Sequence, residues 1–329
     1  MLTFVDLFCG GGFGARGAVN AGARPLLGVD AWDLATATYK HNFNCEVRTA
    51  TIEELIEDGL DKLSKQFQPD VLLTSPECTS HSIARGSRPG CEKSKETAIG
   101  IIPWLEAMQP RWLIVENVTR MSNWDRHAEL IQDIESYGYT VSELRLNAAD
   151  FGAPQARKRM FLLCDSMGSS VTSEELYHEY GQKFQPARSV IDWSGKYKST
   201  PLYKTGRARA TLARAERAMS ELGRGKSFII VYYGSDYAGG WQSLDAPLRT
   251  ITTLDRFGLV TWSEGEPYLR MLQPDELLSA MGAPTHEFPS GINRRNKVKL
   301  CGNGVCSPVT EMIFRKINAI QAQELSKAS

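Results

Sequence analysis

The stretch Phe4-Val-Asp-Leu-Phe-Cys-Gly-Gly-Gly-Phe-Gly (residues 4–14) places a glycine-rich turn directly after a short apolar run. The run at 4–8 predicts a buried strand, and residues 15–21 predict a helix after the turn. Glycines let the backbone approach a ligand closely, and a helix N-terminus offers free N–H groups to an anionic moiety. This strand–turn–helix unit therefore predicts a site for a nucleoside cofactor.

The residues that follow extend the same pattern. A second predicted strand at 25–29 ends before Asp30, whose carboxylate can accept hydrogen bonds from ribose hydroxyls. That arrangement alone does not separate NAD from S-adenosylmethionine. Further predicted strands and helices alternate along the chain, at 71–74, 112–115 and 159–164 for strands and at 34–41, 53–65 and 100–108 for helices. Alternation of this kind indicates an α/β fold with a doubly wound, mostly parallel sheet.

The pattern changes after Asp165. A turn-rich segment follows, and regular strand–helix alternation does not resume before the C-terminal part. We expect a helix at 206–222 and strands at 228–233 and 250–253 in this region. We therefore predict one domain formed by residues 1–165 and completed by 298–329, and a smaller, irregular domain at 166–297.

The composition is that of an ordinary soluble globular protein, with 42% hydrophobic and 23% charged residues among 329. The apolar N-terminal run is too short to span a membrane and lacks the basic start of a signal peptide. Seven cysteines without a Cys-x-x-Cys pair argue against a disulfide framework or a structural zinc site. We expect a cytoplasmic monomer without a metal ion or a membrane partner.

Charge is balanced overall, with 38 basic and 38 acidic residues, but it is unevenly distributed. The span 183–226 holds eleven lysines and arginines and only three acidic residues, Asp192, Glu216 and Glu221. Such asymmetry is typical of a surface that faces phosphates. A solvated charged face would give the same pattern, so this feature alone leaves both interpretations open.

Three later segments carry side chains of the kinds that take part in catalysis. Asp70-Val-Leu-Leu-Thr-Ser-Pro-Glu-Cys-Thr-Ser-His-Ser puts Cys78 on a loop just after a buried strand. Glu116-Asn-Val ends a later strand, and Gln155-Ala-Arg-Lys-Arg precedes another. Ligands of such folds bind at the carboxyl ends of the strands. Taken alone, a segment of each kind is more often structural than functional. The functional interpretation rests on the order of the three segments along the chain.

In that order, the chain resembles the bacterial and phage cytosine-C5 DNA methyltransferase family. The resemblance rests on the glycine turn, the cysteine loop, Glu116-Asn-Val and Gln155-Ala-Arg-Lys-Arg, followed by Tyr268 to Gly282 and by Gly302-Asn-Gly-Val. The only long unmatched stretch, about 166–245, falls where the family keeps its variable target-recognition region. The resemblance implies a methyltransferase-type sheet, S-adenosylmethionine as cofactor and double-stranded DNA as substrate.

The chemistry of the reaction suggests roles for the matched residues. Cytosine C5 is a poor nucleophile, so a thiolate must first add at C6, and Cys78 is expected to do so. Glu116 is expected to hold the N3 edge of the base. Arg157 and Arg159 can bind the base carbonyl and phosphates through planar forks. The resemblance to the family implies that Arg157 is the better candidate for contact with the flipped-out base.

The resemblance also implies two sets of binding residues. For the cofactor we expect Phe8, Gly10, Gly12, Asp30, Ile52 and Asn303. For DNA we expect Ser80, Ser82, Arg85, Arg88 and Gln155, most of them on a loop that closes over the substrate.

The sequence departs from the family at several motif positions. Glu77 and Thr79 flank the cysteine where the family has proline and glutamine. Phe13 stands where a glycine is common, and Thr51 where an aspartate often reads the adenine amino group. The consequence of Glu77 and Thr79 for the nucleophile is left open.

Two alternatives remain at this stage. A tRNA cytosine-C5 methyltransferase would share the catalytic domain, but such proteins carry a Cys-Phe-Thr signature that is absent here. A catalytically silent DNA-binding relative would be expected to lose Cys78 or Glu116-Asn-Val, and both are present. The recognition sequence and a cognate restriction endonuclease as partner are left open.

Overall fold

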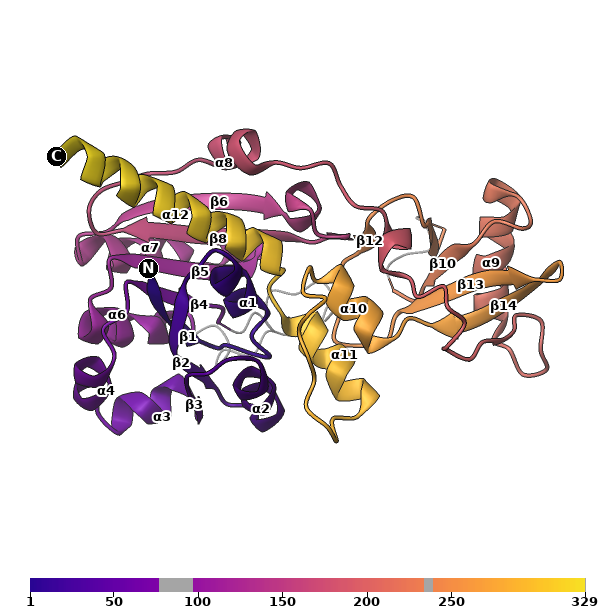
Figure 1. Cartoon of the computed structure of the whole chain (residues 1–329), viewed down its shortest axis with the longest axis horizontal. Helices are drawn as coiled ribbons and strands as arrows, with labels where there is room; N and C mark the ends of the chain where they lie inside the picture. The colour runs from indigo at the N-terminus through magenta and orange to yellow at the C-terminus, as the bar shows by residue number, and fades with distance from the viewer. Residues whose placement is uncertain (77–96, 234–238, 329) are drawn as a thin grey trace.

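A computed structural model describes residues 1–76, 97–233 and 239–328 of the chain (Figure 1). Its larger sheet has seven strands in the order β3-β2-β1-β4-β5-β8-β6. The first five of these are parallel, whereas β8 runs antiparallel to both β5 and β6. The bounds are β1 (Thr3–Leu7), β2 (Arg24–Asp30), β3 (Glu46–Thr49), β4 (Val71–Thr74), β5 (Trp112–Val118), β6 (Thr140–Asn147) and β8 (Lys158–Asp165). The predicted doubly wound, mostly parallel α/β fold is confirmed.

Helices cover both faces of this sheet, because its central strands are apolar on both sides. In β1, Phe4 belongs to the core on one face and Val5 to the core on the other. The first face is covered by α1 (Phe13–Asn20), α2 (Asp33–Asn42) and α12 (Ser307–Ala328). The second is covered by α3 (Ile52–Glu57), α4 (Leu60–Gln66), α6 (Ile102–Met108) and α7 (His127–Ser136). The long helix α12 crosses the first face beside α1 (Figure 1).

Two sequence predictions about local structure are wrong. The helix expected at 53–65 is divided into α3 and α4 at Gly59, whose φ of 93° is unfavourable for other residues. The strand expected at 250–253 is absent, since pairing stops after β12 (Leu248–Arg249), which joins β7 (Gln155–Ala156). Beyond it, the backbone N–H and C=O of Ile251 bind the side chains of Gln155 and Arg157 instead of a strand.

A second, five-stranded sheet lies beside the first, in the order β11-β10-β13-β14-β9 (Figure 1). Its strands are β9 (Thr200–Pro201), β10 (Phe228–Val231), β11 (Trp241–Ser243), β13 (Phe257–Ser263) and β14 (Glu266–Met271), and α9 (Arg209–Leu222) packs against β10 and β11. By contrast α8 (Ser173–Tyr180), which also follows Asp165, packs against β6 and α12 of the larger part. The domain limits at 165 and 297 stay a prediction.

The other described elements are short. They are the 3-10 helices η2 (Ile99–Ile101), η3 (Thr119–Asn123), η4 (Ala148–Phe151) and η5 (Ala187–Val190), and the helices α10 (Pro274–Ala280) and α11 (Arg294–Asn303). Among the described residues, no helix is long and apolar enough to cross a membrane.

Many cations of the basic span 183–226 have partners within the chain. Arg207 donates to the carbonyl of Leu202, and Arg217 to that of Gly239. Others form ion pairs or lie over aromatic rings, as in Arg188–Asp245, Lys196–Asp192, Arg214–Tyr232 and Arg224–Trp262. These cations therefore help to hold the second part together, and the span is not simply a phosphate-facing surface.

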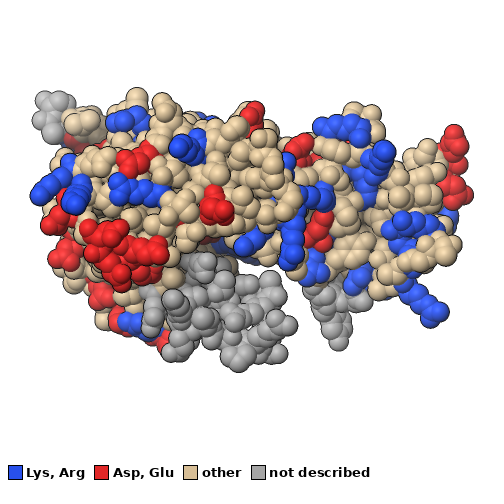
Figure 2. Space-filling view, turned by 90° about the horizontal axis from the view of Figure 1, so that it is seen from below, with Lys and Arg blue, Asp and Glu red and all other residues tan. Residues whose placement is uncertain are grey.

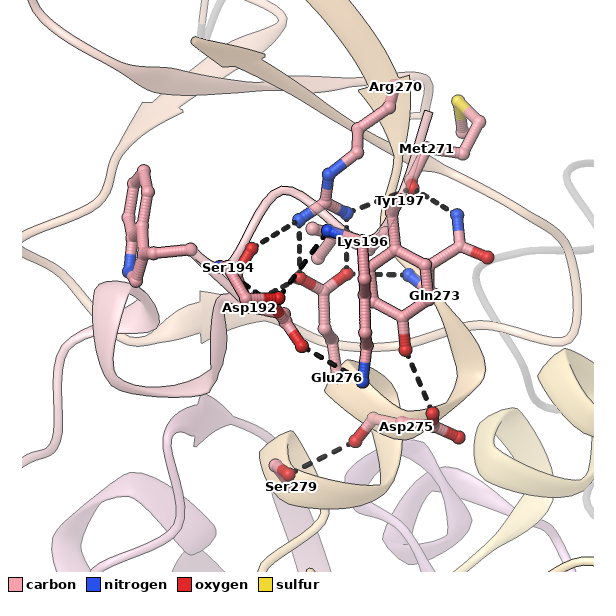
Figure 3. Close-up of polar contacts among 12 residues, drawn as sticks. Asp192, Ser194, Lys196, Tyr197, Arg270, Met271, Gln273, Asp275, Glu276 and Ser279 are labelled. Carbon is pink, nitrogen blue, oxygen red and sulfur yellow. Dashed lines mark hydrogen bonds and ion pairs between the residues drawn. The ribbon is translucent and has the colours of Figure 1, made fainter. Parts of the chain in front are cut away.

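A buried ion pair connects the second sheet to α10 (Figure 3). Arg270 of β14 and Glu276 of α10 approach to 2.7 Å, with side-chain exposures of 7% and 2%. The Glu276 carboxylate also accepts hydrogen bonds from the backbone N–H groups of Asp192 and Gln273. A buried pair with this many donors is well satisfied, so it fixes the segment around Asp192 against α10.

We expect Glu276→Gln to destabilise the protein severely, because it leaves the Arg270 charge buried without a counter-charge. The cost should be about 3 kcal/mol in the free energy of unfolding, measured by urea denaturation. The exposed pair Arg126–Glu129 supplies the control, since Glu129→Gln should leave unfolding nearly unchanged. Equal effects of the two substitutions would contradict a special role for the buried pair.

Candidate active site

The glycine turn adopts backbone conformations that glycine reaches easily and that most other residues avoid. Gly10 and Gly12 have φ values of 52° and 86°, and Gly12 is the N-cap of α1. A Cβ on Gly12 would lie 2.5 Å from the ring of Phe43, whereas one on Gly10 would meet no atom within 4 Å. Phe8 also has a positive φ, 56°, which is costly for a non-glycine residue and marks a functional turn. The space beside the Cα of Gly10 is therefore open.

Asp30 lies at the end of β2 and supports this turn. Its two carboxylate oxygens accept hydrogen bonds of 2.8 Å from the backbone N–H groups of Gly10 and Trp32. Burial raises the pKa of the Asp30 carboxyl, and the two N–H donors and Lys299 oppose that rise. Asp30 thus ties the end of β2 to the turn while it stays partly exposed.

Residues from four segments converge on one pocket above this turn. Phe8 and Gly10 line it together with Ser75 after β4, Glu116 of β5 and Asn303 at the end of α11. The remaining lining residues are Asp6, Cys9, Phe13, Gly14, Leu73, Gly304 and Val305. The structure therefore places three of the expected cofactor residues beside the expected catalytic acid.

Ile52 is not brought to this pocket. Its side chain is 1% exposed and packs in the core on the second face of the sheet. The preceding Thr51 caps α3, since its hydroxyl accepts a hydrogen bond from the backbone N–H of Glu54. At this position the side chains stabilise a helix, and the Thr51 backbone N–H also donates to the Glu54 carboxylate, at 2.8 Å.

Glu116 is paired with Arg159 across two antiparallel strands. Arg159 of β8 faces Val118 of β5, two residues from Glu116 and on the same side of the sheet, and its Nε lies 3.0 Å from Glu116 Oε1. Burial raises the pKa of the Glu116 carboxyl, and the charges of Arg159 and Arg157 offset part of that rise. The site therefore holds a buried carboxyl that keeps its proton to higher pH than usual.

Arg157 and Gln155 form hydrogen bonds with distant parts of the chain. Arg157 is 3% exposed and donates to the carbonyls of Ile251, at 3.0 Å, and Gly302, at 2.8 Å. Gln155 is fully buried, and its side chain binds the backbone of Ile251 and Ala280. These hydrogen bonds occupy both side chains within the protein, and the roles expected for Arg157 at the base and for Gln155 at DNA stay predictions. Both side chains are occupied in joining β7 to the chain beyond β12.

Asn117 holds the start of the cysteine loop. Its side-chain Nδ2 donates to the carbonyl of Pro76 at 3.3 Å, and its Oδ1 accepts from the backbone N–H of Val118. Ser75 likewise donates to the carbonyl of Phe8 at 3.0 Å. Cys78, Ser80, Ser82, Arg85 and Arg88 lie outside the described residues, so their expected roles stay predictions.

We expect Arg157→Ala to lower stability, since it leaves the buried carbonyl of Ile251 and the half-buried carbonyl of Gly302 without their donor. The free energy of unfolding should fall by about 2 to 3 kcal/mol. Arg159→Ala, at the more exposed of the two arginines, should cost less stability and more activity. Urea denaturation together with initial methylation rates separates these effects, and the reverse ranking would favour Arg157 as the substrate-binding residue.

Lysine and arginine side chains gather at the junction of the two parts. Figure 2 shows them beside a hollow between the two parts. Cations around a hollow raise the local concentration of anionic substrates, so this face is suited to a polyanion.

Solved structures that resemble this chain identify its fold class. Dnmt2 of S. pombe superimposes with a TM-score of 0.65 at 16% identity, over 97% of this chain and 99% of that one. DNMT2 of Spodoptera frugiperda gives a TM-score of 0.62 at 17% identity, over 96% and 99%. The chain therefore has a methyltransferase fold.

Sequence comparison identifies the family. The profile of the C-5 cytosine-specific DNA methylases matches residues 2–319. The type II methyltransferase M.HgiDI of Herpetosiphon aurantiacus is 27% identical over 250 residues, 75% of this chain and 79% of that relative. The chain belongs to the C-5 cytosine-specific DNA methylase family and is a DNA cytosine-5-methyltransferase.

Proposed function

We propose that the protein transfers a methyl group from S-adenosylmethionine to carbon 5 of a flipped-out cytosine in duplex DNA, through a covalent bond between Cys78 and C6. The observation that supports this most directly is the shared pocket. A buried carboxyl, Glu116, faces the same space as the glycine turn and Asn303. A base and a methyl donor bound there would meet beside an acid.

The residues present fit S-adenosylmethionine. The space beside Gly10, just before α1, is open, and Asp30 lies at the end of the adjacent strand. Asn303 adds a polar amide from the opposite side of the pocket. When bound, the cofactor supplies an electrophilic methyl group on a sulfonium. The chain's part is to fix that group's position relative to the base.

The chain's own residues would prepare and complete the substitution. The Cys78 thiolate forms a bond to C6 while Glu116 donates a hydrogen bond or proton at N3, so that electron density reaches C5. Arg159, which forms an ion pair with Glu116, would bind the carbonyl on the same base edge. Once C5 carries the methyl group, the C5 proton passes to water, N3 returns any proton that it took to Glu116, and cleavage of the sulfur–C6 bond restores the ring and the thiolate.

The substrate would be duplex DNA with one base turned out. A cytosine stacked in a helix cannot reach a pocket formed by β1, β5 and α11, so the base must leave the stack. The hollow with its surrounding cations is suited to the phosphates on either side. The second sheet, on the far side of that hollow, would read neighbouring bases.

Tritiated S-adenosylmethionine incubated with either duplex DNA or tRNA tests the proposal. We expect label in duplex DNA alone, and bisulfite sequencing of DNA from an expressing host should locate it on C5 of cytosine. Label in tRNA alone would favour an RNA substrate. Absence of label in both would favour a catalytically silent DNA-binding protein.

A further inference from the structure

Phe13 replaces a common glycine of the family motif, and the structure shows how the fold accommodates its ring. Phe13 is the first residue of α1, is 1% exposed and lines the pocket. Its ring lies against two glycines that face it. A Cβ on Gly304 would be 2.5 Å from Phe13 Cδ2, and one on Gly11 would be 3.2 Å from Phe13 Cε2. The ring therefore fills the space between the glycine turn and the end of α11.

His286 backs this ring from the side away from the pocket. It comes from the segment after α10, is 2% exposed and does not belong to the pocket lining. Its ring centroid lies 4.8 Å from that of Phe13, with an interplanar angle of 31°. Its Nε2 lies 2.7 Å from the carbonyl oxygen of Gly11. One side chain thus contacts both the bulky residue of the turn and the turn's backbone.

The contact with Gly11 determines the form of the imidazole. A carbonyl oxygen only accepts hydrogen bonds, so Nε2 must carry the proton. Burial, together with the nearby charges of Arg16 and His41, lowers the pKa of His286 to about 4, although the hydrogen bond to the Gly11 carbonyl opposes that shift. His286 is therefore a neutral donor at physiological pH. Its hydrogen bond to the turn does not depend on titration there.

We infer that His286 is a positioning residue for the cofactor: together with Phe13 it fixes the turn at Gly11, so that affinity for S-adenosylmethionine depends on a side chain that does not touch the ligand. The inference rests on the proposed function, because it assumes that this turn binds the cofactor. Its physical basis is preorganisation. A turn with three consecutive glycines loses much conformational freedom on binding, and a fixed carbonyl and a packed ring reduce that loss.

Substitutions at His286 separate its two contacts. His286→Ala removes both, His286→Phe retains a ring against Phe13 without a donor, and His286→Gln retains an N–H donor for Gly11. The control is His41→Ala, a neighbouring histidine that is 42% exposed and pairs with Glu287. Calorimetry gives the Kd for S-adenosylmethionine, and fluorescence anisotropy gives the Kd for duplex DNA.

We expect His286→Ala to raise the Kd for S-adenosylmethionine about tenfold and to leave the Kd for DNA within about twofold. His286→Gln should recover more of the cofactor affinity than His286→Phe, and His41→Ala should behave as wild type. If His286→Ala does not fold, the comparison of His286→Gln with His286→Phe supplies the same test.

Two results would overturn the inference. One is an unchanged cofactor Kd in a folded His286→Ala, and the other is parallel weakening of cofactor and DNA binding. Both presuppose that the wild-type protein binds S-adenosylmethionine. Absence of that binding would overturn the proposed function itself, so the two failures are distinguishable.

Discussion

Replacing Cys78 with alanine should abolish methyl transfer, with a loss of roughly a thousandfold or more in turnover. Without a thiolate at C6, carbon 5 of cytosine stays too weak a nucleophile to accept the methyl group. Binding of cofactor and DNA should persist, since neither needs the sulfur. The measurement is the initial rate of label transfer to duplex DNA, with Kd values for both ligands determined on the same preparation.

A trapping experiment adds a direct test of the covalent step. Duplex DNA with 5-fluorocytosine at the target should form a stable adduct, because fluorine cannot leave C5 as a proton does. The matched control is Cys45→Ala, at a half-buried thiol whose pKa is raised by burial to about 11 and which is therefore a poor nucleophile. An adduct that persists in Cys78→Ala would place the nucleophile elsewhere.

Glu116→Gln is the second large effect that we expect, with turnover reduced by about 10²- to 10³-fold. An amide can hydrogen-bond to the base but cannot supply a proton at N3. Since burial raises the pKa of Glu116, the wild-type carboxyl holds its proton until the pH rises through that raised value. Activity should therefore fall on the alkaline side as Glu116 ionises, and the variant should lack this limb.

The pH–rate profile of kcat with labelled cofactor measures both parts of this prediction. Glu129→Gln, an exposed carboxylate paired with Arg126, should retain the wild-type profile. An alkaline limb that persists unchanged in Glu116→Gln would mean that another group controls it. Turnover close to wild type would remove Glu116 from the chemistry.

Features encoded by local pattern were predictable from the sequence. The strand at 4–8, the glycine turn and Asp30 lie within one short stretch, and their spacing alone dictates a ligand-binding turn. The position of Glu116 at the end of a buried strand was likewise predictable, because parallel strands present their carboxyl ends together. The order of such motifs carried the family assignment.

Features that depend on distant contacts were not predictable. Gln155 and Arg157 belong to a motif that suggested substrate contact, yet both are buried against Ile251, about a hundred residues later in the chain. His286 has no motif around it and becomes meaningful only beside Phe13. Asn117 follows Glu116 in the sequence, but its contact with the start of the cysteine loop is seen only in its hydrogen bond to Pro76. Contacts of this kind arise from the topology of the fold, which the hydrophobic periodicity of the sequence does not predict.

The packing of α12 on α1 has a consequence for how the protein is made. Helix α12 follows the whole second sheet in the chain, yet it covers the first face of the larger sheet, and Gly17 of α1 is so close to it that a Cβ there would lie 2.1 Å from the carbonyl oxygen of Ser307. During synthesis, α12 cannot cover the apolar side of α1 until nearly three hundred further residues have been added. The nascent chain thus exposes an apolar surface until α12 has been synthesised. A chaperone that binds exposed apolar segments would protect it during that interval.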